Sequence, residues 1–213
     1  PISGVTLRAN AINLVEFNDT AVLTCSVLNG SSLSYVWLKG NSEVTDGGGV
    51  QFSNGNATLT MVGVTRYDEG PFRCNVSNGL GHEISLPVRL NISYGPYNTS
   101  MTIMPMRSTY KTGSNITLSC SAESSPQAMF QWMFNWMYLN KSGPLLQLER
   151  VTVSDSGTYK CIIHNTVTAR FSSESAMIRI VGKVGFVVFS RVPYVYLILF
   201  LSAKALRIFF SRQ

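Results

Sequence analysis

Four cysteines, placed in two similar segments, constrain the fold of this chain of 213 residues more than any other feature. A tryptophan follows twelve residues after the first and the third cysteine, and the strings DEGPFRC and DSGTYKC end at the second and the fourth. The copies are offset by 95 residues at the tryptophan and by 87 at the last cysteine, so a duplication with a deletion of eight residues explains both. The marks are Cys25, Trp37 and Cys74 in the first copy and Cys120, Trp132 and Cys161 in the second.

Short segments around these marks alternate between apolar and polar residues with period two, as half-buried strands do. Clusters of Gly, Pro, Asn and Asp separate the segments, and no clear helical stripe interrupts them before residue 181. An all-β fold is therefore predicted. The alternating segments are residues 21–27, 59–61, 88–92, 116–120 and 146–148.

The Cys-Trp-Cys spacing, with an aromatic residue two positions before the second cysteine, is typical of an immunoglobulin-like β-sandwich. The sequence predicts two tandem sandwiches, residues 1–94 and 95–181, followed by an apolar basic tail, residues 182–213. Some other β fold with a chance arrangement of Cys and Trp is the alternative, and the repetition of the pattern disfavours it. Trp37 and Trp132 are the expected core tryptophans. Trp136, four residues after Trp132, shares its inward strand phase and is also expected in the core.

In a sandwich of this type one disulfide joins the two sheets of each domain. Each bond closes a loop of roughly 40–50 residues, which stabilises the fold by about 4 kcal/mol. Tyr159 can supply the hydrogen bond of a tyrosine corner, whereas Phe72 has no hydroxyl. Such bonds persist in an oxidising compartment, so the domains are expected to be secreted or at the cell surface. The expected bonds are Cys25–Cys74 and Cys120–Cys161.

Eight N-x-[ST] sequons occur where the composition alone would give about three, which predicts N-glycosylation. The alternative is that a chain rich in Ser and Thr forms sequons without glycans. By strand phase Asn75, Asn91 and Asn115 point outward. Asn75 and Asn91 are expected on one sheet of the first domain, where two glycans would cover the face and make the domain a spacer. The sequon asparagines are Asn18, Asn29, Asn56, Asn75, Asn91, Asn98, Asn115 and Asn140.

Three strings in residues 1–181 resemble the carcinoembryonic-antigen-related cell adhesion molecules: residues 64–74, 92–96 and 115–120. The resemblance implies tandem short-type immunoglobulin domains on the cell surface, in a family that mediates adhesion and modulates signalling. That family carries its adhesive face on an amino-terminal variable-type domain, so the two domains here resemble its membrane-proximal spacers.

The chain departs from this family at Gly47–Gly49, where relatives usually place a basic residue that pairs with the aspartate of the turn before the second cysteine. Asp68 is therefore expected to find another partner or to cap its own turn.

The net charge of +6 is not spread over the domains. Residues 1–181 hold 12 Lys and Arg against 11 Asp and Glu, whereas residues 182–213 hold five basic residues and no acid. The basicity belongs to an apolar tail, so no nucleic-acid partner is expected.

Residues 185–203 form an apolar stretch of about the ~20 residues that a membrane helix needs, and basic residues follow it. Arg191 and Pro193 weaken this interpretation. We expect a single-pass anchor with an extracellular amino terminus, and the alternative is a truncated or misread terminus without a membrane role.

Nothing in the sequence indicates an enzyme, a cofactor or a metal site. The two histidines, His82 and His164, lie in different domains, and Gly47–Gly49 lacks the Lys-Ser or Lys-Thr of a phosphate loop. The expected function is adhesion or recognition by contact with other cell-surface proteins, homophilic or heterophilic. The alternatives are a secreted decoy or immune-modulating ligand and a receptor fragment of the same fold.

Overall fold

The computed structural model describes the backbone and side chains of residues 1–182 and, beyond them, the backbone of three short strands. These strands, β19 (Phe186–Val187), β20 (Tyr196–Leu201) and β21 (Ala205–Phe210), pair antiparallel in the order β19-β20-β21. No helix among the described residues is long and apolar enough to cross a membrane. The predicted span, residues 185–203, falls largely outside the described residues.

The described chain is all-β, as predicted, with one short 3-10 helix, η1 (Val153–Asp155). It divides into two compact units. Unit 1 contains residues 1–97 together with two later segments, 123–128 and 165–170. Unit 2 contains residues 98–122 and 129–164 and continues from Phe171.

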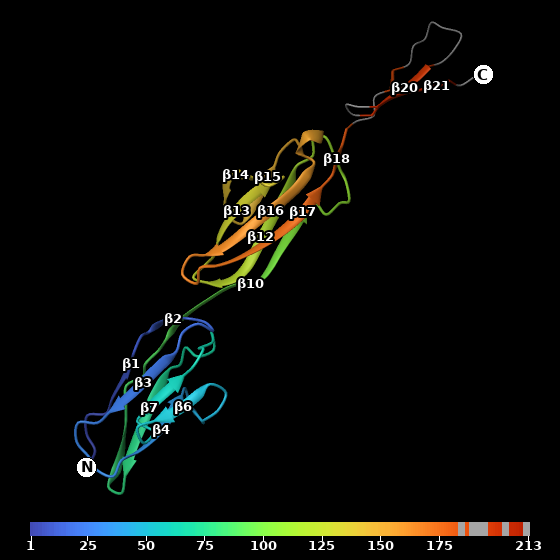
Figure 1. Cartoon of the computed structure of the whole chain (residues 1–213). Coiled ribbons are helices and arrows are strands. Elements are labelled where there is room, and N and C mark those ends of the chain that lie inside the picture. Colours follow the sequence, from blue (N-terminus) through green and yellow to red (C-terminus); the bar gives the residue numbers. More distant parts are fainter. Residues whose placement is uncertain (183–185, 188–195, 202–204, 211–213) are drawn as a thin grey trace. The chain divides into compact units, whose positions relative to one another are not determined.

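Unit 1 is a sandwich of two four-stranded sheets, ordered β1-β3-β7-β6 and β5-β4-β8-β9 (Figure 1). β2 pairs in parallel with the first residues of β10, a long strand that starts in unit 1 and ends in unit 2. The strands of unit 1 are β1 (Thr6–Ala9), β2 (Asn13–Val15), β3 (Ala21–Ser26), β4 (Ser34–Lys39), β5 (Ser42–Glu43), β6 (Val50–Ser53), β7 (Thr58–Met61), β8 (Phe72–Asn78) and β9 (Gly81–Ile84).

Alternation of side chains along β3 and β8 builds the core of unit 1, because every second residue is buried and the residues between them face outward. Trp37, Phe72 and Leu59 are among its largest fully buried side chains. The core thus lies between the two sheets, where the Cys25–Cys74 bond also lies.

Unit 2 repeats the arrangement with the sheets β14-β13-β16-β17 and β15-β12-β10, and β11 pairs in parallel with β18. Its core is buried by the same alternation and includes Trp132, Ile116 and Ile163. Its strands are β10 (Asn91–Met104), β11 (Tyr110–Lys111), β12 (Ile116–Ser125), β13 (Met129–Phe134), β14 (Met137–Ser142), β15 (Leu145–Leu148), β16 (Gly157–Asn165), β17 (Arg170–Ile178) and β18 (Ile180–Val181).

Candidate recognition site

The structure forms one disulfide inside each unit, with the pairings expected from the sequence. The Cα atoms are 6.3 Å apart in the Cys25–Cys74 bond and 6.6 Å apart in the Cys120–Cys161 bond. No cysteine is free. Each bond ties the two sheets of its unit together across the core.

Trp37 and Trp132 occupy the core positions predicted for them, with 1% and 0% of their surface exposed. Each indole nitrogen donates a hydrogen bond to a backbone carbonyl, that of Asn56 at 2.7 Å and that of Gly143 at 2.9 Å. A buried indole N–H needs such a partner, which fixes the orientation of each ring.

Asp68 both caps its turn and forms an ion pair. It therefore has a partner although no basic residue stands at positions 47–49. One carboxylate oxygen, Oδ2, accepts hydrogen bonds from the backbone N–H and the hydroxyl of Thr65, at 2.8 and 2.9 Å. The other contacts Nζ of Lys39 at 3.0 Å. Burial alone would raise the pKa of Asp68, but the contacts with Thr65 and Lys39 outweigh it and hold that pKa below its ordinary value.

The matching turn of unit 2 carries the tyrosine corner that the sequence predicts. The hydroxyl of Tyr159 donates to the backbone carbonyl of Asp155 at 2.9 Å, and its ring lies 4.7 Å from that of Phe134. Burial, together with the nearby charge of Asp155, raises the pKa of Tyr159 to about 12. The carboxylate of Asp155 caps the turn through the N–H and the hydroxyl of Thr152, at 2.7 and 2.9 Å.

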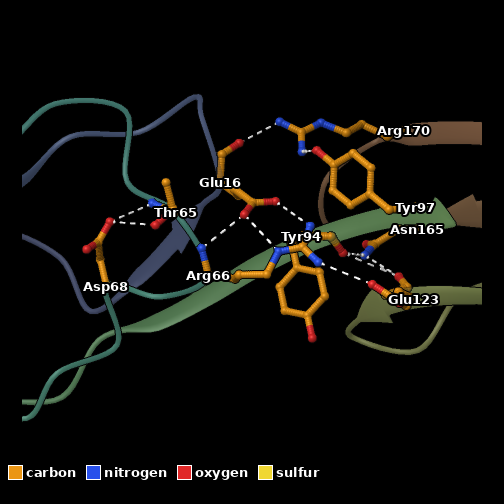
Figure 2. Close-up of polar contacts among 10 residues, drawn as sticks. Glu16, Thr65, Arg66, Asp68, Tyr94, Tyr97, Glu123, Asn165 and Arg170 are labelled. Carbon is orange, nitrogen blue, oxygen red and sulfur yellow. Dashed lines mark hydrogen bonds and ion pairs between the residues drawn. The ribbon is translucent and has the colours of Figure 1, made fainter. Parts of the chain in front are cut away.

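A polar cluster around Arg66 lies inside unit 1 (Figure 2). The guanidinium binds the buried carboxylate of Glu16 in a bidentate manner, with Nε–Oε1 2.9 Å and Nη2–Oε2 3.0 Å. The backbone N–H of Arg66 also donates to Oε1 at 3.0 Å. Although burial alone would raise the pKa of Glu16, these hydrogen bonds and the positive charge of Arg66 lower it.

Two aromatic rings and a second arginine complete this cluster (Figure 2). The guanidinium of Arg66 lies 4.0 Å from the ring centroid of Tyr94 and 4.7 Å from that of Tyr97. Arg170 donates to the Tyr97 hydroxyl at 3.0 Å and to the backbone carbonyl of Glu16 at 2.6 Å. Both oxygens of the Glu16 carboxylate are paired within the fold. The cluster therefore has a structural role and is not an open ligand site.

The four-stranded sheet β14-β13-β16-β17 presents an outer surface with several large apolar side chains, which we call the unit 2 face. Its strands point alternate residues outward, and many of these are large and apolar. This face was not predicted from the sequence, although apolar residues at outward positions in 129–133 and 171–177 indicate it. Its apolar members are Met129, Met133, Trp136, Tyr138, Ile162, Phe171 and Met177.

Trp136 belongs to this face and not to the core, so the expectation for it was wrong. It is 76% exposed, in the turn between β13 and β14. Its φ of 69° and that of 45° at Asn135 lie in the left-handed region, which ends the strand before its alternation reaches position 136. The ring lies 5.7 Å from Nζ of Lys160, within range of a cation–π contact.

Cross-strand pairs order the side chains of the unit 2 face. At one end Met133 stands between Tyr138 and Lys160 on the neighbouring strands. At the other end Met129 pairs with His164, whose ring stacks on Phe171 at 3.9 Å, so this histidine has an aromatic contact.

A hollow of about 340 Å³ lies at the edge of the unit 2 face. It is lined by Gln131, Tyr138, Leu139 and Asn140, so one predicted glycosylation site borders it. Two amide side chains and an aromatic ring thus flank the apolar surface with polar groups, as the rim of a protein interface does.

The equivalent face of unit 1, on β5-β4-β8-β9, has a sequon asparagine at its centre. Asn75 pairs with Val36 on β4 and with Ile84 on β9. Its side chain is half-buried, and its Oδ1 is buried with no hydrogen-bond partner among the described residues. The matching position of unit 2, 87 residues later, is Ile162.

Asn91 does not lie on that face, which corrects the expectation that two sequons share it. It is the first residue of β10, where it pairs with Asn13 on β2. The reason is that β8 begins at Phe72, which still bridges to Val88, so the chain has passed the end of β8 before it reaches Asn91. Apart from Asn75, all the predicted glycosylation sites are exposed: Asn18, Asn29, Asn56, Asn91, Asn98, Asn115 and Asn140.

The described residues contain no group of three or more His, Cys, Asp or Glu side chains placed to hold a metal ion. His82 lies on β9 in unit 1 and His164 on β16 in unit 2.

Comparison with solved structures finds the same architecture in other proteins. The I-band fragment I67-I69 of titin matches with a TM-score of 0.60 and 20% identity, over 96% of this chain and 77% of that one. The four amino-terminal Ig domains of Dscam1 isoform 6.9 match with a TM-score of 0.52 and 23% identity, over 84% of this chain and 47% of that one. The chain thus spans about half of the Dscam1 fragment, and at these identities the likeness concerns the fold.

The family comparison agrees with the cysteine and tryptophan frame. The family model described as immunoglobulin domain matches residues 5–78 and 100–165, one stretch for each repeat. Each stretch contains one disulfide and one buried core tryptophan. The chain therefore belongs to the immunoglobulin domain family.

Proposed function

We propose that this chain is a cell-surface recognition protein that binds other proteins through the unit 2 face. The observation that carries the proposal is the exposed apolar surface of β14-β13-β16-β17, with Trp136, Tyr138 and Phe171 at its two ends. Contiguous exposed apolar surface with a polar rim is typical of a protein interface, and aromatic residues and Met are enriched there. No enzymatic step is part of this function.

Unit 1 serves as a glycosylated spacer in this proposal. A glycan on Asn75 would cover Val36 and Ile84, the apolar neighbours on the adjoining strands. Unit 2 carries Ile162 at the equivalent place, which leaves the centre of its face open. In this proposal only unit 1 is a spacer, whereas the sequence led us to expect that both units are spacers.

The covalent chemistry of the chain supports an extracellular location. Two disulfides and seven exposed sequon asparagines suit an oxidising, glycosylating compartment. We further propose that the apolar residues 185–203 anchor the chain, as in the membrane-proximal part of the carcinoembryonic-antigen-related adhesion molecules that the sequence resembles. Surface biotinylation of expressing cells tests the anchor, since a secreted decoy would appear in the medium.

A grafted glycan tests the unit 2 face directly. The double change Ile162→Asn and His164→Ser creates in β16 the sequon that β8 carries at Asn75. Cells that display the full chain are added to epithelial and leukocyte layers, and we expect the graft to abolish adhesion. His164→Ser alone is the matched control for the lost ring stack, and Asn75→Gln should leave adhesion intact. Adhesion that survives an occupied graft would contradict the proposal.

A further inference from the structure

We propose that the partner of the unit 2 face is a different protein, which presents a carboxylate among apolar side chains and places it on Lys160. The inference rests on the proposed function and deepens it by naming the chemistry of the partner. It follows from the position of one charge on an otherwise uncharged surface.

Lys160 is held in place by the face itself. It lies half-buried on β16, an inner strand of the sheet, directly opposite Met133. Its ammonium is 5.7 Å from the centroid of the Trp136 ring, so a cation–π contact orients it. An ammonium among apolar side chains attracts an anion more strongly than one surrounded by water, because the effective dielectric constant is lower.

Its counter-charge is missing from the described surface. In the part of the chain that the structure describes, no carboxylate forms an ion pair with Lys160, whereas Lys39 of unit 1 is paired with Asp68. Lys160 is also the one formal charge among the described residues that the four strands of the sheet direct outward, with histidine counted as neutral. A partner that covered the face without a carboxylate would bury this charge unpaired, and the lost hydration would oppose binding.

This charge pattern argues against a second copy of the chain as the partner. Two unit 2 faces laid against each other would bring together two lysines and no acid, and like charges brought together at an interface disfavour association. An acidic lipid surface is also a poor fit, because such surfaces recruit clusters of about four to eight basic residues. One fixed cation within an apolar patch fits one carboxylate on an apolar protein surface.

Random twelve-residue peptides on phage provide the test. They are selected on cells that display the full chain and then compared on cells that display its variants. We expect the selected peptides to share an Asp or Glu flanked by apolar residues, and their binding to fall at least about tenfold with Lys160→Glu, as expected when a charge-assisted contact is lost. Lys160→Arg should bind nearly as well, and Lys141→Glu, on the edge strand β14, is the matched control and should have no effect.

A charge swap completes the test, since a peptide whose acid is replaced by Lys should bind Lys160→Glu better than the unchanged chain. Peptides that bind the face but show no acidic preference, or that tolerate Lys160→Glu, would overturn the inference and leave the proposed function standing. If every selected peptide still binds cells that display the chain with the glycan graft at position 162, the proposed function fails, and the inference fails with it. Self-adhesion of displaying cells that resists Lys160→Glu would likewise overturn the inference.

Discussion

The turns that lead into β8 of unit 1 and β16 of unit 2 have a similar sequence but are secured by different chemistry. Both contain a threonine and, three residues later, an aspartate that caps the turn. In unit 1 the aspartate also pairs with Lys39, whereas in unit 2 the turn is fixed by the Tyr159 hydroxyl. Beyond the shared aspartate cap, one turn therefore has an ion pair and the other a neutral hydrogen bond.

The difference involves two positions that change together. Lys39 of unit 1 corresponds to Phe134 of unit 2, and Phe72 corresponds to Tyr159. Lys39 lies 5.9 Å from the Phe72 ring, and the Phe134 ring lies 4.7 Å from that of Tyr159, so each pair is in contact. The disulfide and the tryptophan are common to both units, which shows that the frame tolerates either pair.

The same contrast extends to the buried ion pair of unit 1. Glu16 and Arg66 correspond to Lys111 and Val153, which in unit 2 are exposed. Unit 1 thus depends on electrostatics at two neighbouring places, while the matching places of unit 2 do not. The stability of unit 1 should accordingly respond to acid and that of unit 2 to alkali.

Removal of a disulfide should have the largest effect and the same effect in both units. The bonds span 49 and 41 residues, so replacing either pair of cysteines by alanine should destabilise its own unit by about 4 kcal/mol. Calorimetry of each double variant should show one of two unfolding transitions lost or lowered. A much larger loss in one unit would break the equivalence of the two frames.

Arg66→Met should be the next most damaging change and should affect unit 1 alone. It leaves the Glu16 carboxylate buried without its bidentate partner, which costs at least about 3 kcal/mol. Adding Glu16→Gln to Arg66→Met should restore part of the loss, because the unpaired charge is then removed. Equal stability of the single and double variants in denaturant unfolding would show that the ion pair is not what matters here.

Tyr159→Phe should weaken unit 2 by about 1–2 kcal/mol, since the hydrogen bond to the Asp155 carbonyl is lost. The reverse change, Phe72→Tyr, should give unit 1 no gain, because Lys39 occupies the place of the Phe134 ring. The folded-state pKa of about 12 lies above the ordinary value of about 10, so the contribution of Tyr159 is present below pH 10 and is lost as the pH rises towards 12. Unfolding curves from pH 8 to 12 should show this loss in the unchanged chain and not in Tyr159→Phe.

Acidification should have the smallest of these effects, and it should destabilise unit 1 instead of unit 2. The pKa values of Asp68 and Glu16 are lowered by folding, so both groups stabilise unit 1 above their ordinary values near pH 4, and this contribution is lost as the pH falls below them. Thermal unfolding between pH 6 and 2.5 should therefore lower the transition of unit 1 first. Asp68→Asn should flatten part of that dependence, and an unchanged profile in this variant would remove Asp68 from the explanation.

The sequence was sufficient for the frame because the frame depends on short periods and fixed spacings. The cysteine pairing and the two buried core tryptophans follow from marks that repeat along the chain, and the Tyr159 hydrogen bond follows from a hydroxyl that Phe72 of the first copy lacks.

The candidate site was not predicted because it depends on where strands begin and end. Strand phase placed Trp136 in the core, but the positive φ of Asn135 and Trp136 turned the chain outward. Asn91 was placed on the wrong sheet for a similar reason, since alternation does not show that β8 begins at Phe72 and ends the pairing at Val88. The Lys39–Asp68 pair also escaped, because 29 residues separate two side chains that meet only in the folded unit.

The half-buried carboxamide of Asn75 has a consequence for biosynthesis. Once the sheet forms, Asn75 lies between Val36 and Ile84 on the adjoining strands, and the adjacent Cys74 is tied to Cys25. Because this side chain is half-buried in the folded unit, an oligosaccharide would be attached most readily while the segment is still extended, during entry into the secretory pathway. Occupancy at Asn75 would then depend on whether glycosylation or disulfide formation comes first. The same polypeptide would leave the cell in two forms, with and without this glycan. Their ratio would report how fast unit 1 folded.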